Sequence, residues 1–326
     1  MKAPYFWYDK KSLMGLILAP LGILYRTGAL LRRVFVSPVQ ASVPVICVGN
    51  IVAGGAGKTP TAIAIARVLQ EQGGKPVFVT RGYGGNKKGP LRVDTTTHTA
   101  KDVGDEALLL ANIAPCWIGR SRPQAIRFAQ QEASHIILDD GLQNPTIAPD
   151  ISLLVVDGAV GFGNRKLFPA GPLRETLHDA FSRVAAIVMI GEDKERVTYC
   201  LGKTVLRAKL VPSLPPTFLK EPKVLAFAGI GRPQKFYDSC KEAGLVIVQS
   251  NDFPDHHVYS AKNMKELTAA ATKKDLSLIT TAKDWIRIPE TYRTDICVLE
   301  VDLVFEDADA LNHVIQSSIT ASRAPS

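Results

Sequence analysis

The fold is decided by Val43-Pro-Val-Ile-Cys-Val48 and the loop that follows it, Gly49-Asn-Ile-Val-Ala-Gly-Gly-Ala-Gly-Lys-Thr59. The apolar run predicts a strand, and the stretch 61–70 after the loop predicts a helix. A glycine-rich loop between a strand and a helix presents backbone N–H groups to phosphates at the positive end of the helix. Its lysine reaches the β- and γ-phosphate oxygens, and its threonine can bind Mg²⁺. The predicted phosphate contacts are Gly54, Gly55, Ala56, Gly57, Lys58 and Thr59.

This loop departs from the strict P-loop pattern at one position. The pattern requires a glycine five residues before Gly57, and the chain has Val52 there. Gly54 and Gly55 supply the backbone freedom instead. A glycine-rich turn without a ligand is the alternative, but Gly-Lys-Thr at a strand-to-helix junction favours phosphate binding.

Strand and helix patterns alternate after the loop. Valine-, isoleucine- and leucine-rich runs that predict strands lie at 75–80, 134–138, 151–156 and 184–190, with helices predicted at 106–112 and 122–132. A second series follows the proline-rich stretch 211–216, with strands at 223–228, 245–248, 276–280 and 297–301 and a helix at 234–243. Such alternation is typical of a mostly parallel sheet with helices on both faces. We therefore expect an α/β fold of the P-loop NTPase type, with a nucleotide-binding core over 37–210, a smaller α/β domain over 211–326 and a frayed tail over 320–326.

The N-terminal segment 1–36 has a different character. Residues 12–25 carry no charged side chain, while Lys2, Lys10 and Lys11 precede them and Arg26, Arg32 and Arg33 follow. A membrane-spanning helix needs about 20 apolar residues, so this stretch is too short to be one. A secretory signal peptide would end in a cleavage site of small residues, and none follows the stretch. A helix lying on an anionic membrane surface is therefore favoured. A helix docked on the protein's own core is the alternative.

Composition excludes several classes of protein. The chain has 326 residues, is 46% hydrophobic and 21% charged, and carries a formal net charge of +8. These values exclude a disordered or fibrous chain. The five cysteines are scattered, odd in number and never spaced as CxxC, so we expect reduced thiols and no zinc site. We expect no nucleic-acid partner and no obligate protein partner.

Acidic residues and histidines form three further clusters. Asp139 and Asp140 follow the strand 134–138, where P-loop NTPases place the carboxylate that orients Mg²⁺. The sequence Asp-Gly also favours turns. Because the chain has a glycine-rich phosphate loop at 49–59, metal binding by at least one of Asp139 and Asp140 is the better interpretation. Residues 104–106, Gly-Asp-Glu, begin a predicted helix, and their carboxylates either cap that helix or take part in catalysis. The histidines of 253–257, Phe-Pro-Asp-His-His, are typical of a surface loop when nothing else is known.

The ordered set of these motifs resembles the tetraacyldisaccharide 4′-kinase family, which phosphorylates the lipid A precursor in Gram-negative bacteria. The resemblance runs from the N-terminal apolar segment to about residue 290. It rests on seven motifs: GNIVAGGAGKTP (49–60), TRGYGG (80–85), VGDEA (103–107), DDGLQ (139–143), FPAGPLRE (168–175), FPDHHVY (253–259) and TTAKDW (280–285). Leu142 departs from the family, which usually has phenylalanine there; the carboxylates and Gln143 are retained.

The resemblance implies ATP and Mg²⁺ between two α/β domains, and a lipid substrate, the tetraacyldisaccharide 1-phosphate, at the cytoplasmic face of the inner membrane. Asp105 and a histidine of the 253–257 loop would form a catalytic dyad, with His256 favoured over His257. Lys58 would clamp the phosphates, and Arg174 would recognise a phosphate of the nucleotide or the sugar. The implied Mg²⁺ ligands are Thr59, Glu106, Asp139 and Asp140. Arg81 and Arg120 are weaker phosphate candidates.

Two other functions are compatible with a P-loop beside a membrane helix. A membrane-bound partitioning ATPase would hydrolyse ATP without a sugar acceptor and would have no use for a histidine loop in a second domain. A nucleotide-binding scaffold without catalysis would not need an acid–base pair. Asp105 and the 253–257 loop therefore favour the lipid kinase.

Overall fold

The computed structural model describes residues 4–197, 202–215, 218 and 223–324. Cys200 and the ends of two predicted segments, Pro216 and residues 325–326, lie outside this part. In the N-terminal half the helices are η1 (Tyr5–Trp7), α1 (Leu13–Ile17), α2 (Ala19–Val34), α3 (Lys58–Glu71), α4 (Ala100–Val103), α5 (Asp105–Ala111), α6 (Arg122–Ala129) and α7 (Leu177–Phe181). The strands there are β1 (Val45–Gly49), β2 (Pro76–Thr80), β3 (Leu91–Arg92), β4 (Cys116–Ile118), β5 (His135–Asp139), β6 (Ile151–Asp157) and β7 (Ala186–Ile190).

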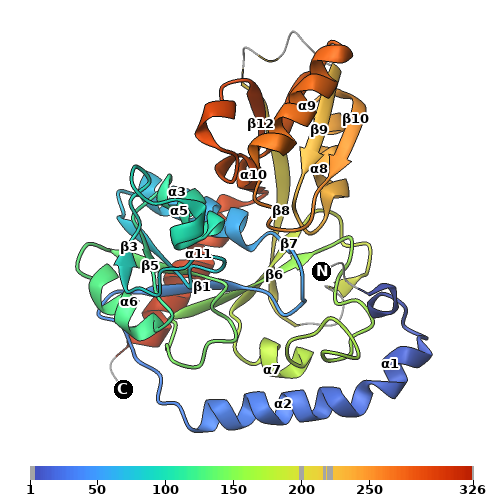
Figure 1. Ribbon diagram of the computed structural model, residues 1–326. Helices are drawn as coiled ribbons and strands as arrows, with labels where there is room; N and C mark the ends of the chain where they lie inside the picture. Colours follow the sequence, from blue (N-terminus) through green and yellow to red (C-terminus); the bar gives the residue numbers. More distant parts are fainter. Residues whose placement is uncertain (1–3, 198–201, 216–217, 219–222, 325–326) are drawn as a thin grey trace.

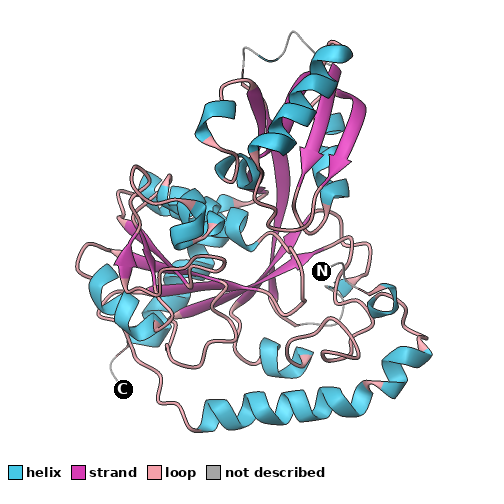
Figure 2. Cartoon of the chain, viewed as in Figure 1, coloured by secondary structure: helices cyan, strands magenta, loops and turns pink. Residues whose placement is uncertain are grey.

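The second half completes the same sheet. Its strands are β8 (Thr204–Ser213), β9 (Lys223–Ala228), β10 (Val246–Asp252), β11 (Ser277–Thr281) and β12 (Ile296–Phe305), and its helices are α8 (Pro233–Glu242), α9 (Ala261–Lys273), α10 (Ala282–Ile286), η4 (Glu290–Tyr292) and α11 (Ala308–Arg323). The described strands form one sheet in the order β10-β9-β11-β12-β8-β7-β6-β1-β5-β2-β4-β3. Their pairings are parallel except for β12 with β8 and β3 with β4. The predicted mostly parallel α/β fold is confirmed (Figures 1 and 2).

Helices cover both faces of the sheet. Apolar side chains of α3, α5 and α11 pack on one face of the N-terminal strands, and those of α6 and α7 pack on the other. Around β9 and β11, α8 and α9 cover opposite faces in the same way. This burial explains why the central strands read as continuous apolar runs, since neither face meets water.

The chain crosses between the two halves on adjacent strands. β8 leaves the N-terminal strands and β12 returns to them, paired antiparallel from Glu300↔Ser213 to Phe305↔Ala208. After β12, α11 packs on the N-terminal core through Leu311 and Ile315. The predicted boundary between two domains at residue 210 therefore stays a prediction. In the structure α11, although it belongs to the second half of the sequence, lies with the first half of the chain (Figure 1).

The predicted frayed tail is wrong for residues 320–323. Those residues continue α11. At its end, Arg323 Nε lies 2.7 Å from Oδ1 of the buried carboxylate of Asp150 and forms an ion pair with it. The apolar spacing of Leu311, Val314 and Ile315 places one face of the helix on the sheet. Burial of that face outweighs the usual fraying of a chain end.

The N-terminal helices lie along the edge of the molecule, away from the sheet (Figure 1). Gly15, Gly22 and Trp7 face the protein and are buried. The opposite face exposes a run of large apolar side chains, with Leu13, Leu16, Ile17, Ile23, Leu24, Leu31, Val34 and Phe35 all more than half exposed. Among the described residues, no helix is both long and apolar enough to span a membrane.

Candidate active site

The predicted phosphate loop lies at the carboxyl end of β1 and leads into α3, where the sequence predicted it. Gly57 caps α3 with a φ of 90°, and a side chain there would place its Cβ 2.4 Å from Ile190 Cδ1. Gly54 also has a positive φ, 126°, and a Cβ on it or on Gly55 would meet open space. The loop therefore needs glycine at position 57 and leaves its other side open to a ligand.

Lys58 lies among polar groups at the base of the loop. Its Nζ is 3.3 Å from Asn50 Oδ1 and 3.6 Å from Asp140 Oδ1. Arg174 Nη1 lies 3.3 Å from the same oxygen of Asp140. Burial raises the pKa of Asp140, but the charges of Lys58 and Arg174 outweigh it and leave that pKa below its usual range. Two cations are thus gathered beside the loop by one ionised carboxylate.

Asp139, at the end of β5, contacts the first turn of α3. Thr59 Oγ1 donates to Asp139 Oδ2 at 3.1 Å. Among the described residues, Asp139 Oδ1 is buried without a hydrogen-bond partner. Burial, followed by the negative charges of Glu106 and Asp140, raises the pKa of Asp139 to about 7. An unpaired buried carboxylate oxygen is costly unless a cation or donor satisfies it.

Glu106 is paired with a residue from the second half. Lys283 Nζ, on α10, donates to Glu106 Oε1 at 2.6 Å. Within the described part of the chain, no three histidine, cysteine, aspartate or glutamate side chains are grouped closely enough to hold a metal ion. Mg²⁺ commonly uses one or two carboxylates together with phosphate oxygens and water. The Thr59–Asp139 pair, with its unsatisfied oxygen, fits such an ion.

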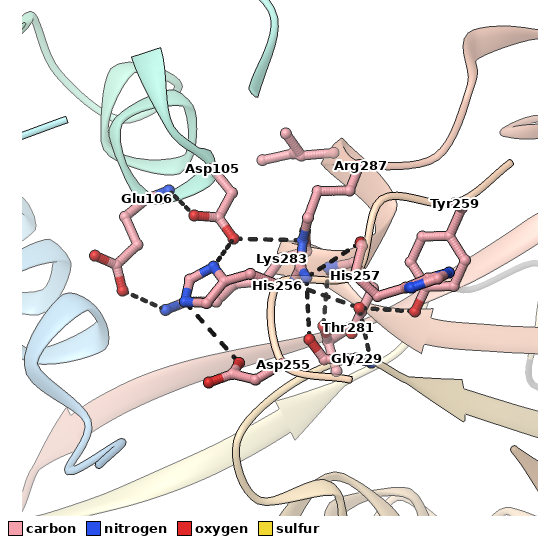
Figure 3. Close-up of polar contacts among 12 residues, drawn as sticks. Asp105, Glu106, Gly229, Asp255, His256, His257, Tyr259, Thr281, Lys283 and Arg287 are labelled. Carbon is pink, nitrogen blue, oxygen red and sulfur yellow. Dashed lines mark hydrogen bonds and ion pairs between the residues drawn. The ribbon is translucent and has the colours of Figure 1, made fainter. Parts of the chain in front are cut away.

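Asp105 and His256 are in contact although 151 positions separate them in sequence. Asp105 opens α5, and His256 lies in the loop after β10 with a φ of 59°. His256 Nδ1 is 3.2 Å from Asp105 Oδ2, and the buried Arg287 Nε lies 3.3 Å from the same oxygen (Figure 3). His257 instead bonds Asn263 Oδ1 through Nε2 at 3.2 Å. The structure therefore brings the first histidine, and not the second, to the carboxylate.

The charge of Asp105 is held by this arrangement. Burial raises its pKa, but the hydrogen bond from His256 and the charges of Arg287 and Lys283 leave the pKa below its ordinary value. The hydrogen bond to Asp105 in turn raises the pKa of His256. Asp105 is thus an ionised carboxylate whose orientation His256 and Arg287 fix.

One cleft joins the glycine-rich loop and His256, with Asp105 buried behind the histidine. It has a volume of about 1280 Å³ and is lined from both halves of the chain. Lys58, Glu106, Asp140, Arg174, His256 and Lys283 all face it. Arg81 and Arg120 line it too.

Comparison with known proteins gives the family. The family model described as tetraacyldisaccharide-1-P 4′-kinase matches residues 14–320. The chain belongs to this family. It is 47% identical over 307 residues to a tetraacyldisaccharide 4′-kinase from Paramagnetospirillum magneticum, covering 93% of this chain and 94% of that protein. A kinase of the same name from Gluconobacter oxydans is 40% identical over 326 residues, covering 98% and 99% of the two chains.

A solved structure has the same fold as this family member. LpxK from Aquifex aeolicus, described as an "apo" form in complex with ATP, superposes with a TM-score of 0.77 at 25% identity. The match covers 94% of this chain and 100% of that one. The predicted family, fold and enzyme class are confirmed: the protein is a kinase of lipid A biosynthesis that phosphorylates a hydroxyl group.

Sequence reasoning missed three contributors to this kinase site. Arg287 was not singled out, and Lys283 and Asp284 were seen only as members of the 280–285 motif. Asp284 is fully buried and accepts hydrogen bonds from Gly229 N, Tyr259 Oη and Thr281 Oγ1. Their position at the carboxyl end of β11 was the available signal, because parallel strands present their functional groups at that edge.

His256 is expected to make the stability of the protein depend on pH. A group whose pKa is raised by folding stabilises fully below its unfolded pKa of about 6.5 and loses its effect as pH rises through the folded pKa. The Tm difference between the wild-type protein and His256→Ala should therefore be largest near pH 6 and shrink toward pH 8. Thermal denaturation across this range checks it. In an Asp105→Asn background the trend should disappear, and a difference that grows with pH would contradict the interpretation.

Proposed function

We propose that this chain transfers the γ-phosphoryl group of ATP to the 4′-hydroxyl of a tetraacyldisaccharide 1-phosphate, giving lipid IVA, through the residues described above. The observation that carries the proposal is His256, which faces the same cleft as Lys58 and the glycine-rich loop and is hydrogen-bonded to the buried Asp105. A hydrolase that needed only water would have no evident use for a histidine delivered from the second half of the chain. A positioned acid–base pair beside a phosphate loop suits transfer to an acceptor hydroxyl.

Asp105 is assigned the proton-accepting role. Phosphoryl transfer has a loose transition state, so the acceptor proton leaves late and the catalyst mainly positions the hydroxyl. An ionised carboxylate fixed by His256 and Arg287 provides both the orientation and the acceptor oxygen. His256 would keep Asp105 in place through their hydrogen bond, and Arg287 would balance the charge of the carboxylate.

The phosphates of ATP are assigned to the loop. Backbone N–H groups of Gly54, Gly55, Ala56 and Gly57 would contact them, with Lys58 at the β- and γ-oxygens. Arg174 would bind a phosphate oxygen of the nucleotide or the sugar, leaving its present partner Asp140. Both cations already face the cleft.

Mg²⁺ is assigned to the carboxylates beside the loop. Thr59 and Asp139, with Glu106 and Asp140, would hold the ion, and the unsatisfied Asp139 Oδ1 supports this placement. When bound, the ion neutralises phosphate charge during transfer. Lys283 would continue to balance Glu106 in its absence.

The exposed face of α1 and α2 is assigned to an anionic membrane surface at the cytoplasmic side of the inner membrane. Its apolar side chains are flanked by basic residues, of which Lys11 and Arg32 are exposed, while Lys10, Arg26 and Arg33 form ion pairs with carboxylates of the protein. Exposed apolar side chains beside basic ones are typical of interfacial helices. The alternative, in which the N-terminal helices pack on the protein's own core, accounts for the buried face of α1 and α2, which carries Gly15 and Gly22, but not for the exposed one. The lipid substrate would thereby reach the cleft from the bilayer.

Removing part of the apolar face should weaken membrane binding. The double variant Ile23→Ser/Leu24→Ser is expected to bind vesicles containing phosphatidylglycerol about 100-fold more weakly, since each of the two side chains contributes about 1.4 kcal/mol and every 1.4 kcal/mol is tenfold. Vesicle co-sedimentation at low and high salt measures it. Val246→Ser/Val248→Ser, two similarly exposed residues of β10, is the matched control. Equal binding by both variants would reject the membrane assignment.

A transfer assay tests the reaction itself. Full-length protein is incubated with γ-labelled ATP, Mg²⁺ and the disaccharide 1-phosphate in mixed micelles, beside a sample without acceptor. Label is expected in the lipid product. Label found only as free phosphate in both samples would support the partitioning-ATPase alternative and reject the kinase proposal.

A further inference from the structure

The segment Leu167–Glu175 lies between the N-terminal helices and the glycine-rich loop. On the side of the helices, Trp7 Nε1 donates to the carbonyl of Pro169 at 3.0 Å. The ring of Tyr25 lies 5.7 Å from that of Phe168 in an edge-to-face arrangement. The segment is thus packed directly on η1 and α2.

On its other side, the same segment pairs with the start of the loop through backbone hydrogen bonds. Arg174 N donates to Ile51 O at 2.7 Å, and Ala53 N donates to Pro172 O at 2.8 Å. A shift of the segment must therefore move residues 51–53, because two main-chain bonds tie them together.

Glu175 joins these two sides by its side chain. The carboxylate is buried and accepts from Arg33 Nη2 on α2 at 3.0 Å, from Arg183, and from Gln143 Nε2 at 3.0 Å. Gln143 Nε2 also donates to Asn50 O at 2.8 Å. Asn50 Oδ1 in turn lies 3.3 Å from Lys58 Nζ. An unbroken series of polar contacts therefore runs from the last turn of α2 to the phosphate-binding lysine.

We propose that Glu175 is a positioning residue for the glycine-rich loop and that Arg33 of α2 sets its orientation. Charge-assisted hydrogen bonds in a buried setting hold geometry more strongly than neutral ones. Without Arg33 the carboxylate keeps only the Arg183 cation and turns toward it, which weakens the bond to Gln143 and loosens Asn50 and Lys58. The helix assigned to the membrane and the nucleotide site are therefore linked. This inference rests on the proposed function, in which the loop holds ATP.

The test is the affinity of the full-length protein for ATP, measured by calorimetry without lipid. Arg33→Ala should raise the Kd for ATP about 5- to 10-fold, close to the tenfold that corresponds to 1.4 kcal/mol. Arg33→Lys, which keeps a donor and the charge, should restore the affinity to within about twofold. Glu175→Gln should weaken binding at least as much as Arg33→Ala. Since Glu175 is buried and its variant can fail to fold, Arg33, whose side chain is 26% exposed, carries the test.

The matched control is Arg26→Ala. Arg26 also joins α2 to the protein, through the carboxylate of Asp179 of α7 at 3.2 Å. Asp179 meets Arg183 only through its main-chain carbonyl, and none of the described contacts of its carboxylate is with Glu175, Gln143 or Asn50. Its Kd for ATP should stay within about twofold of wild type. An unchanged Kd in Arg33→Ala, or an equal loss in Arg26→Ala, would overturn the inference. Failure of the wild-type protein to bind ATP would instead reject the proposed function, and the coupling with it.

Discussion

Alanine substitution of Asp105 or of His256 is expected to lower kcat by about 10²–10⁴-fold, the usual effect of losing a general base. Because the two side chains share one hydrogen bond, the double variant should be only a few-fold slower than the worse single variant. Steady-state assays of labelled phosphate in lipid give the four rates of this cycle. Asp105→Asn, which keeps the shape beside Arg287, separates loss of the carboxylate from disruption of the buried site.

His257→Ala is the matched control for this cycle. His257 is bonded to Asn263 and stacks on Phe253, with ring centroids 4.7 Å apart, so its loss should change kcat by only a few-fold. If the effects of Asp105→Ala and His256→Ala multiply, the two residues work independently and the dyad is wrong. A severe loss in His257→Ala with a mild one in His256→Ala would move the role to the other histidine.

Lys58→Ala is expected to lower transfer by at least about 10³-fold while the protein stays folded. The ammonium group would balance charge that develops on the transferred phosphoryl, and removing one such preorganised donor costs about 10²–10³-fold by itself. Loss of Lys58 also leaves Asp140 with fewer cations, which should further repel ATP. The labelled-transfer assay and thermal denaturation measure the two quantities separately.

Lys262→Ala provides the comparison for Lys58. Lys262 is an exposed lysine of α9 whose described ion pair is with Glu266 on the same helix, so its variant should transfer phosphate at the wild-type rate. A folded Lys58→Ala protein with unchanged turnover would reject the assignment of ATP to the loop.

Local pattern was enough to locate the phosphate-loop half of the site. The loop is predictable because a strand, glycines and Lys58 are contiguous, and Asp139 follows a neighbouring buried strand whose end must lie nearby. The pairing of Asp105 with His256 is different, because no local rule relates residues so far apart. It depends on how the second half of the chain is carried over the first, and only the resemblance to a family indicated it.

Two other features show where sequence reasoning stops. The apolar spacing of α11 was present in the sequence, but which part of the molecule it covers depends on the return of β12 to the first core. The role of Arg287 was hidden because a buried arginine and a surface arginine look alike in a sequence. Its carboxylate partners, Asp105 and Asp284, come from different elements.

The antiparallel pair β8 and β12 has a mechanical consequence. These two strands connect the strands β9, β10 and β11, with their covering helices, to the rest of the sheet. Polar contacts between the second half and the first lie around the cleft: His256 and Arg287 with Asp105, Lys283 with Glu106, and Arg232 and Lys235 with Asp157. If the strand pair bends so that the cleft opens, all of these contacts break in the same movement. In that case Asp105 and His256, the proposed catalytic pair, would lie together only while the second half rests on the first, and ATP bound in an open cleft would not be hydrolysed through them.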